Sequence, residues 1–79
     1  MPRYYFDYVC DGDIARDEIG LEFSSIDAAR QGALEALTEW AKELVPHEVI
    51  YEMMIVVRDE RDQQMLTASL VLTVERSQG

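Results

Sequence analysis

The spacing of apolar residues changes period along this chain, and that change constrains its fold most strongly. Residues 3–10 alternate between apolar or aromatic and polar side chains, and a second alternating segment covers residues 18–23. Between residues 26 and 44 the apolar positions recur every three or four residues, as on one side of an amphipathic helix. Residues 49–58 and 64–75 read as two further strands joined by a charged turn. The pattern predicts a hairpin, a helix and a second hairpin.

The predicted architecture is an α+β domain in which one helix packs on one face of a four-stranded antiparallel sheet. A helix of about 20 residues and strands of about eight residues have similar lengths, roughly 30 Å and 27 Å. Ser24 and Ser25 are equally good N-caps for the helix, and Pro46 should end it. Gly32, inside the helix, suggests a close approach of the helix to the sheet. At 79 residues, the sequence accommodates a single domain, residues 1–79.

The third predicted strand is apolar on both of its faces, through Met53 to Val57. A single helix covers only one side of a sheet, so this segment predicts an apolar patch on the other side. Such a patch favours a partner surface, most simply a second copy of the same chain. The alternative is a central strand with a small patch. The residues expected on this interaction face are Tyr5, Val9, Met54, Val56 and Val71.

Charge and composition exclude several classes of partner. Sixteen acidic against seven basic residues give a net charge of −9, which repels phosphate backbones and anionic lipid and leaves a basic protein partner plausible. We therefore expect no nucleic acid and no membrane as partners. Cys10 is the sole cysteine, so the chain forms no internal disulfide. No signal-peptide pattern and no run of roughly 20 apolar residues occurs, which predicts a cytoplasmic protein.

The residues that could support chemistry are better explained by structure. Two acidic runs, at 11–18 and 59–62, raise the possibility of a calcium site, but the spacing is not that of an EF-hand and the two hairpin turns should lie at opposite ends of the sheet. Pro2 resembles the start of small tautomerases, in which a helix, not a strand, follows the first strand. His47 is the only histidine and is expected in a loop, and Cys10 should be a half-buried hydrophobic residue. We predict no catalytic, cofactor-binding or metal-binding residue, and no cofactor.

Several blocks of the sequence resemble a family of short bacterial proteins of unknown function. The resemblance covers nearly the whole chain, with Arg61-Asp62 in place of an expected glycine, and it implies no activity. The blocks are Met-Pro-Arg-Tyr-Tyr-Phe-Asp at 1–7, Asp11-Gly12, Asp17-Glu18-x-Gly20-x-Glu22-Phe23, Ala28-Ala29-Arg30 and Val57-Arg58-Asp59-Glu60.

Three functions remain open from the sequence. The favoured one is a non-catalytic interaction or regulatory module that self-associates, as a homodimer. The second is an acidic neutraliser of a basic protein, by analogy with antitoxins of the partial ribonuclease H-like type, although their proline-glycine-cysteine segment is missing here. The third is a small-ligand-binding protein, which would need a concave pocket that the sequence does not reveal.

Overall fold

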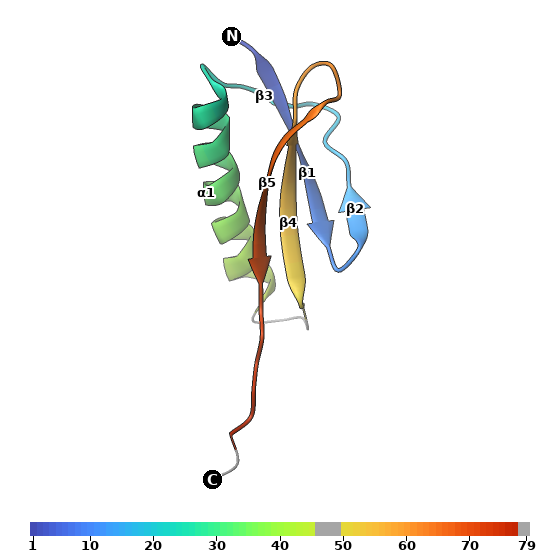
Figure 1. Cartoon of the computed structure of the whole chain (residues 1–79), viewed down its shortest axis with the longest axis vertical. Coiled ribbons are helices and arrows are strands. Elements are labelled where there is room, and N and C mark those ends of the chain that lie inside the picture. Colours follow the sequence, from blue (N-terminus) through green and yellow to red (C-terminus); the bar gives the residue numbers. More distant parts are fainter. Residues whose placement is uncertain (46–49, 78–79) are drawn as a thin grey trace.

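The computed structural model describes residues 1–45 and 50–77 and confirms the α+β class, with one helix against an antiparallel sheet (Figure 1). The predictions made for Pro46, His47 and Val49 concern residues outside the described part of the chain. The elements are β1 (Arg3–Cys10), β2 (Asp13–Ala15), β3 (Leu21–Glu22), α1 (Ile26–Leu44), β4 (Glu52–Arg58) and β5 (Gln64–Val71).

The sheet has five strands instead of four: the strand predicted over residues 18–23 is reduced to β3, and β2 is an additional strand in the segment between the first two predicted strands. The strand order is β2-β1-β4-β5, and β3 pairs with the same edge of β1 as β2 does, further along the strand. The Asp11-Gly12 turn lets the chain pair with β1 at once as β2, opposite Tyr8 to Cys10. The chain then leaves the sheet and returns as β3 opposite Arg3 and Tyr4.

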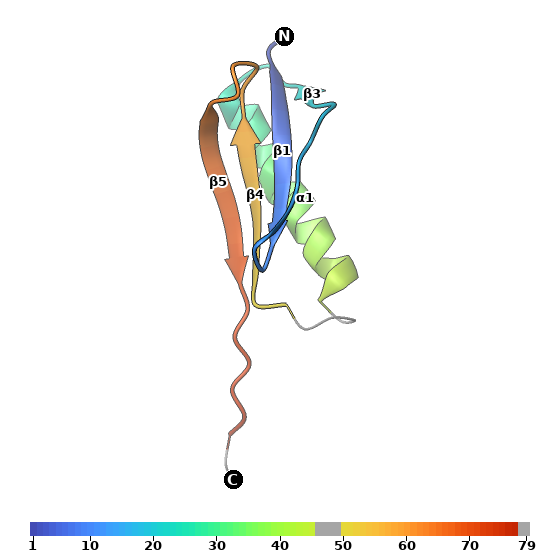
Figure 2. The same ribbon diagram turned by 90° about the vertical axis from the view of Figure 1, so that its right-hand side faces the viewer.

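Helix α1 covers one face of the sheet (Figures 1 and 2). Ser25 is its N-cap and accepts a hydrogen bond from the backbone N–H of Ala28 at 3.1 Å, so the second of the two candidate serines caps the helix. Gly32 lies against the ring of Phe23, where an added Cβ would be 2.9 Å from the nearest ring carbon; the close approach is confirmed, but to the residue that follows β3. The buried core between helix and sheet consists of Tyr4, Phe6, Ala29, Ala33, Leu37, Ile50, Met53, Ile55 and Val57.

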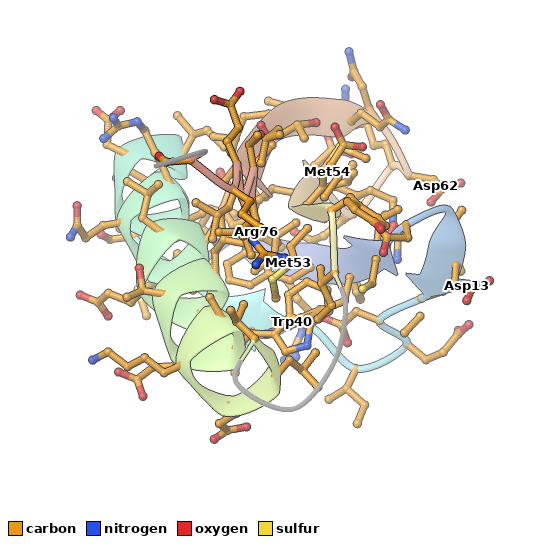
Figure 3. All side chains as sticks on the ribbon, turned by 90° about the horizontal axis from the view of Figure 1, so that it is seen from below. Asp13, Trp40, Met53, Met54, Asp62 and Arg76 are labelled. Atoms are coloured by element: carbon orange, nitrogen blue, oxygen red, sulfur yellow. The ribbon has the colours of Figure 1, made fainter. Side chains whose placement is uncertain are left out.

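Strand β4 projects side chains to both faces, as predicted. Met53 lies on the side of Trp40 and the helix, whereas Met54 lies on the opposite side (Figure 3). The face without a helix carries alternate residues of β1 and β4, which the register sets side by side: Tyr5 beside Arg58, Asp7 beside Val56 and Val9 beside Met54.

Strand β5 ends at Val71, four residues before the predicted end at Glu75. Its pairing partner β4 begins only at Glu52, so the N–H of Leu72 donates to the carbonyl of Tyr51 at 2.9 Å and the ladder stops there. Residues 72–77 then run away from the domain (Figures 1 and 2). We refer to residues 72–77 as the tail.

Candidate functional site

A buried ion pair lies on the face of the sheet that α1 does not cover. The Nε atom of Arg58 donates to Asp7 Oδ2 at 2.6 Å and its Nη2 atom donates to Asp7 Oδ1 at 3.0 Å, with both side chains about nine-tenths buried. The ring of Tyr5 lies 5.1 Å from the guanidinium carbon. Breaking such a pair by removing one partner costs about 3–5 kcal/mol, because the other charge is left buried alone.

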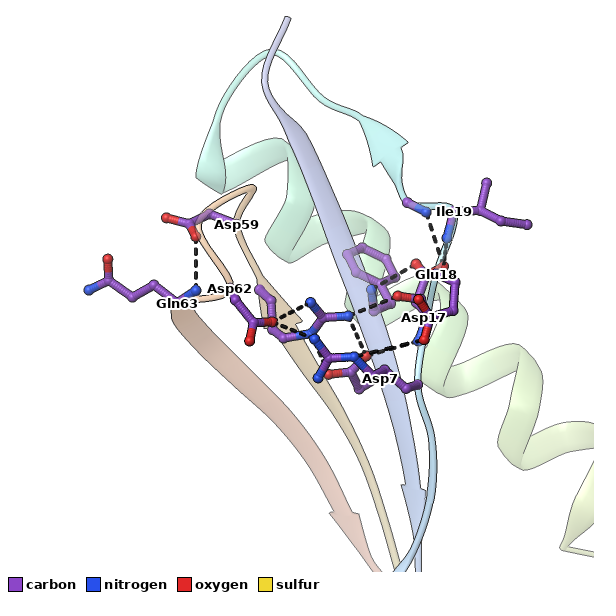
Figure 4. Close-up of polar contacts among 11 residues, drawn as sticks. Asp7, Asp17, Glu18, Ile19, Asp59, Asp62 and Gln63 are labelled. Atoms are coloured by element: carbon purple, nitrogen blue, oxygen red, sulfur yellow. Dashed lines mark hydrogen bonds and ion pairs between the residues drawn. The ribbon is translucent and has the colours of Figure 1, made fainter.

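Asp17 connects this ion pair to the outer edge of β1. One of its carboxylate oxygens accepts from the N–H of Phe6 at 3.0 Å, and the other accepts from Ile19 and Gly20 at 2.9 and 3.0 Å (Figure 4). Its own N–H donates to Asp7, and its carbonyl accepts from Arg58 at 2.8 Å. The carboxylate therefore occupies the part of the β1 edge that lies between β2 and β3.

The loop after β2 also brings together two acidic segments that the sequence placed apart. Asp11, at the first turn, holds the start of β4 by accepting from the N–H of Glu52 at 2.8 Å. Asp62, at the opposite end, accepts from both Arg16 at 2.6 Å and Arg58 at 2.7 Å. The turns themselves lie at opposite ends as expected, but the expectation that the whole acidic runs lie apart is wrong, because the loop carries Arg16 and Asp17 back to the second turn.

The electrostatics of this network keep Asp7 and Asp17 ionised and Arg58 protonated. Burial alone would raise the pKa of Asp7, but hydrogen bonds from Arg58 and the Asp17 N–H outweigh it and hold the pKa below its ordinary value. Burial also opposes the shift at Asp17, whose pKa is lowered by the N–H groups of Gly20, Phe6 and Ile19 and by the charge of Arg58. The hydrogen bond to Asp7 raises the pKa of Arg58. None of these three groups changes protonation near neutral pH.

The network is also saturated with internal hydrogen bonds. Within residues 1–45 and 50–77, every buried side-chain nitrogen and oxygen has a hydrogen-bond partner, and no group of three or more acidic, histidine or cysteine side chains is arranged to hold a metal ion. The carboxylates are interleaved with arginines. We interpret the network as the means by which the loop is attached to the sheet.

The predicted interaction face is less continuous than the sequence suggested. Val9 is only 9% exposed and Tyr5 is half covered beside Arg58, so the ion pair interrupts the apolar residues at the centre. Met54 and Val56 are half-buried, and Val71 is 64% exposed. Cys10 is half-buried and packs against the core, as predicted.

A larger apolar surface lies between α1 and β5, on the helix side of the sheet. It is a groove of about 710 Å³ between the second half of α1 and the end of β5, and Thr38, Lys42 and Ser69 also line it. In the part of the chain that the structure describes, no strand pairs with the edge of β5 which faces away from β4. The apolar side chains that line the groove are Leu34, Leu37, Ala41, Val45, Leu70 and Leu72.

Sequence reasoning did not find this groove, although one signal was available. The chain is 29% charged, yet no charged residue occurs from Gln64 to Val74. Edge strands usually carry charged side chains, lysine above all, that prevent pairing with other chains. An uncharged strand at an edge therefore marks a surface that other chains can reach.

Comparison with known proteins identifies the family. A family model described as a domain of unknown function, DUF6894, matches residues 3–71. The chain belongs to this family. No curated protein and no solved structure matches the chain significantly. No helix in the described residues is long and apolar enough to cross a membrane.

Membership of the DUF6894 family agrees with the resemblance carried by the sequence blocks, and the structure explains why those blocks go together. Asp7 comes from the first block, Asp17 and Gly20 from the third, and Arg58 from the last, and all four meet in the polar network. Four of the residues that carry the resemblance therefore attach the loop to the sheet, whereas the block Ala28-Ala29-Arg30 belongs to α1.

Proposed function

We propose that this domain is a non-catalytic protein-interaction module that self-associates through the open side of β5. The observation that carries the proposal is an uncharged edge strand lying beside an apolar groove. An open edge presents unpaired N–H and C=O groups, and an adjacent groove accepts apolar side chains, which is the pattern of β-strand addition.

One edge of the sheet is covered and the other is open, and this difference supports the proposal. The outer edge of β1 is occupied along its length by β2, by the Asp17 carboxylate and by β3. The outer edge of β5 has neither a covering segment in the described residues nor a charged side chain. Val71 is the member of the predicted interaction face that belongs to this edge.

The polar network supports a role without catalysis. Its carboxylates and guanidinium are engaged with one another, and the pKa directions move Asp7, Asp17 and Arg58 away from neutrality, where general acid–base chemistry operates. A basic protein partner rests on the net charge alone and stays a prediction.

Light scattering after gel filtration tests the proposal. At roughly 50 µM, an association free energy of about −7 kcal/mol already gives mostly dimer. We expect a mass of about twice the 9.1 kDa of the chain. A mass equal to one chain at that concentration would contradict self-association.

A further inference from the structure

We infer that two copies join by antiparallel pairing of β5 with β5, centred on Ser69, and that the tail of each copy completes a strand with the other. This inference rests on the proposed function and specifies its geometry. It would merge two sheets into one, with both helices on the same side.

The hydrogen-bonding direction along β5 permits this pairing. The N–H of Leu72 points to β4, and successive residues of a strand alternate in direction. Thr67, Ser69 and Val71 therefore direct their backbone groups to the open edge, as does Thr73 if the extended tail continues the alternation. An antiparallel partner requires donors and acceptors at every second residue, and this edge supplies them.

The apolar pattern sets the register. The uncharged segment from Gln64 to Val74 has Ser69 at its centre, so full pairing of this segment with itself places Gln64 opposite Val74 of the second copy. Leu66 then lies opposite Leu72, and Ala68 lies opposite Leu70. These side chains are on the helix face, where they extend the apolar groove of each copy across the junction.

The tail is explained by the same register. Val74 is 96% exposed, and the apolar alternation of β5 continues through Leu72 and Val74 beyond the last residue that β4 can pair. In a single copy, residues 72–74 have the alternating pattern of a strand but pair with no strand in the described residues. In the pair, residues 72–74 lie opposite residues 64–66 of the second copy.

Charge complementarity supports the arrangement despite the net charge of −9 on each copy. The paired segments carry no charge, so the repelling groups stay at the periphery. Arg76 lies two residues beyond Val74, so the register brings it near the β4–β5 turn of the second copy, which contains Asp59, Glu60 and Asp62. A cation therefore approaches an acidic turn of its partner.

Disulfide trapping tests the register. In a Cys10→Ala background, Ser69→Cys places two thiols at the two-fold axis, where opposed Cα atoms are about 5.5 Å apart and within disulfide reach. Thr67→Cys is the matched control, because its copies would be offset by four residues, about 13 Å along the strands. We expect a covalent dimer from Ser69→Cys and none from Thr67→Cys alone, and we expect a covalent dimer again when the Thr67→Cys and Val71→Cys proteins are mixed.

A second pair of variants tests the surface without risk to folding. Val74→Asp changes a residue that is 96% exposed in one copy, so we expect unchanged unfolding of the monomer and dimerisation weakened at least tenfold. Ile14→Asp is the matched control: Ile14 is 70% exposed on β2, at the edge of the sheet opposite to β5, and its change should leave dimerisation unchanged. A dimer that resists Val74→Asp, or that traps as readily through Thr67→Cys as through Ser69→Cys, would overturn this geometry while the proposed self-association stands. A protein that is monomeric throughout would overturn both.

Discussion

The carboxylate of Asp17 takes the place of a strand at the edge of the sheet. It satisfies the N–H of Phe6 in the middle of β1 and, with its other oxygen, shapes the loop that leads to β3. Both terminal atoms of the side chain must accept hydrogen bonds, which the two oxygens of a carboxylate do and the oxygen and NH₂ group of an amide do not. An aspartate is therefore needed at residue 17 because its two carboxylate oxygens accept hydrogen bonds from three backbone N–H groups.

Asp17→Asn tests that role with a side chain of the same shape. If the amide oxygen keeps the bonds from Ile19 and Gly20, the NH₂ group meets the N–H of Phe6, and a buried donor loses its partner. We expect a loss of about 1–3 kcal/mol in the free energy of unfolding at pH 7, measured by urea titration. Stability equal to that of the unchanged protein would contradict the assignment.

Acid should weaken the same network. Asp7 and Asp17 have folded-state pKa values below their ordinary 3.8, so the unfolded chain binds more protons than the folded one as the pH approaches that value. Their stabilisation is complete above the ordinary pKa and is lost as the pH falls through the lowered folded values. We expect the stability difference between the unchanged protein and Asp17→Asn to shrink between pH 5 and pH 2, by roughly the part that the charge contributes. Glu43→Gln, at an exposed residue outside the network, is the control for the same change from carboxylate to amide. A constant difference for Asp17→Asn across that range would show that the charge of residue 17 does not stabilise the fold.

At the scale of elements, the short strand β3 depends on a close approach at Gly20. This glycine has φ +74°, and an added Cβ would lie 2.8 Å from the Tyr5 ring and 2.9 Å from the carbonyl oxygen of Tyr4. The loop can return to β1 at this point because there is no side chain.

Gly20→Ala should therefore destabilise the domain more than Gly12→Ala does. Gly12 also has a positive φ, +92°, but a Cβ added there would meet nothing within 4 Å, so it reports the cost of backbone conformation alone. We expect roughly 1–3 kcal/mol for that conformational cost at either site and a further loss at Gly20 from the collision. Thermal unfolding of the two variants side by side measures the difference, and equal losses would show that the contact with Tyr5 does not matter.

The elements that the sequence predicted well are those with a long, regular period. The helix from Ile26 to Leu44 follows from its apolar spacing and its serine cap, and β1 follows from strict alternation. The second strand was not predicted correctly, because Asp17 replaces strand pairing with side-chain pairing and alternation does not reveal that exchange. The end of β5 was misplaced for a different reason: alternation continues to Val74, but the length of the partner strand β4 decides where pairing stops.

In the candidate site, too, the local sequence pattern predicted some features and not others. A two-faced apolar β4 was predicted from Met53 to Val57 and is present, but the Asp7–Arg58 pair beside it joins residues 51 positions apart in sequence, and only the register brings them together. The groove beside β5 requires both the packing angle of α1 and the identity of the edge strand. Neither can be read from the spacing of apolar residues within a single element.

At the scale of the whole molecule, charge and apolar surface are separated. The chain carries a net charge of −9, while its open edge is uncharged from Gln64 to Val74. The longest extent of the molecule is 55 Å, against 21 and 18 Å in the other directions, and residues 72–77 lie along that axis (Figure 1). A second copy that covers this extended, uncharged edge would bury the apolar surface and leave the charges in solvent.

Amide hydrogen exchange, followed residue by residue at several protein concentrations, tests that coverage most directly. The N–H groups of Thr67, Ser69 and Val71 face the open edge in one copy, so dilute protein should exchange them quickly. We expect their exchange to slow by about fivefold once the total protein concentration is ten times the dissociation constant, because about one fifth of the chains are then monomeric, while the amides that bond to β4 change little. Fast exchange of these three amides at every concentration would contradict the claim that a second copy covers β5.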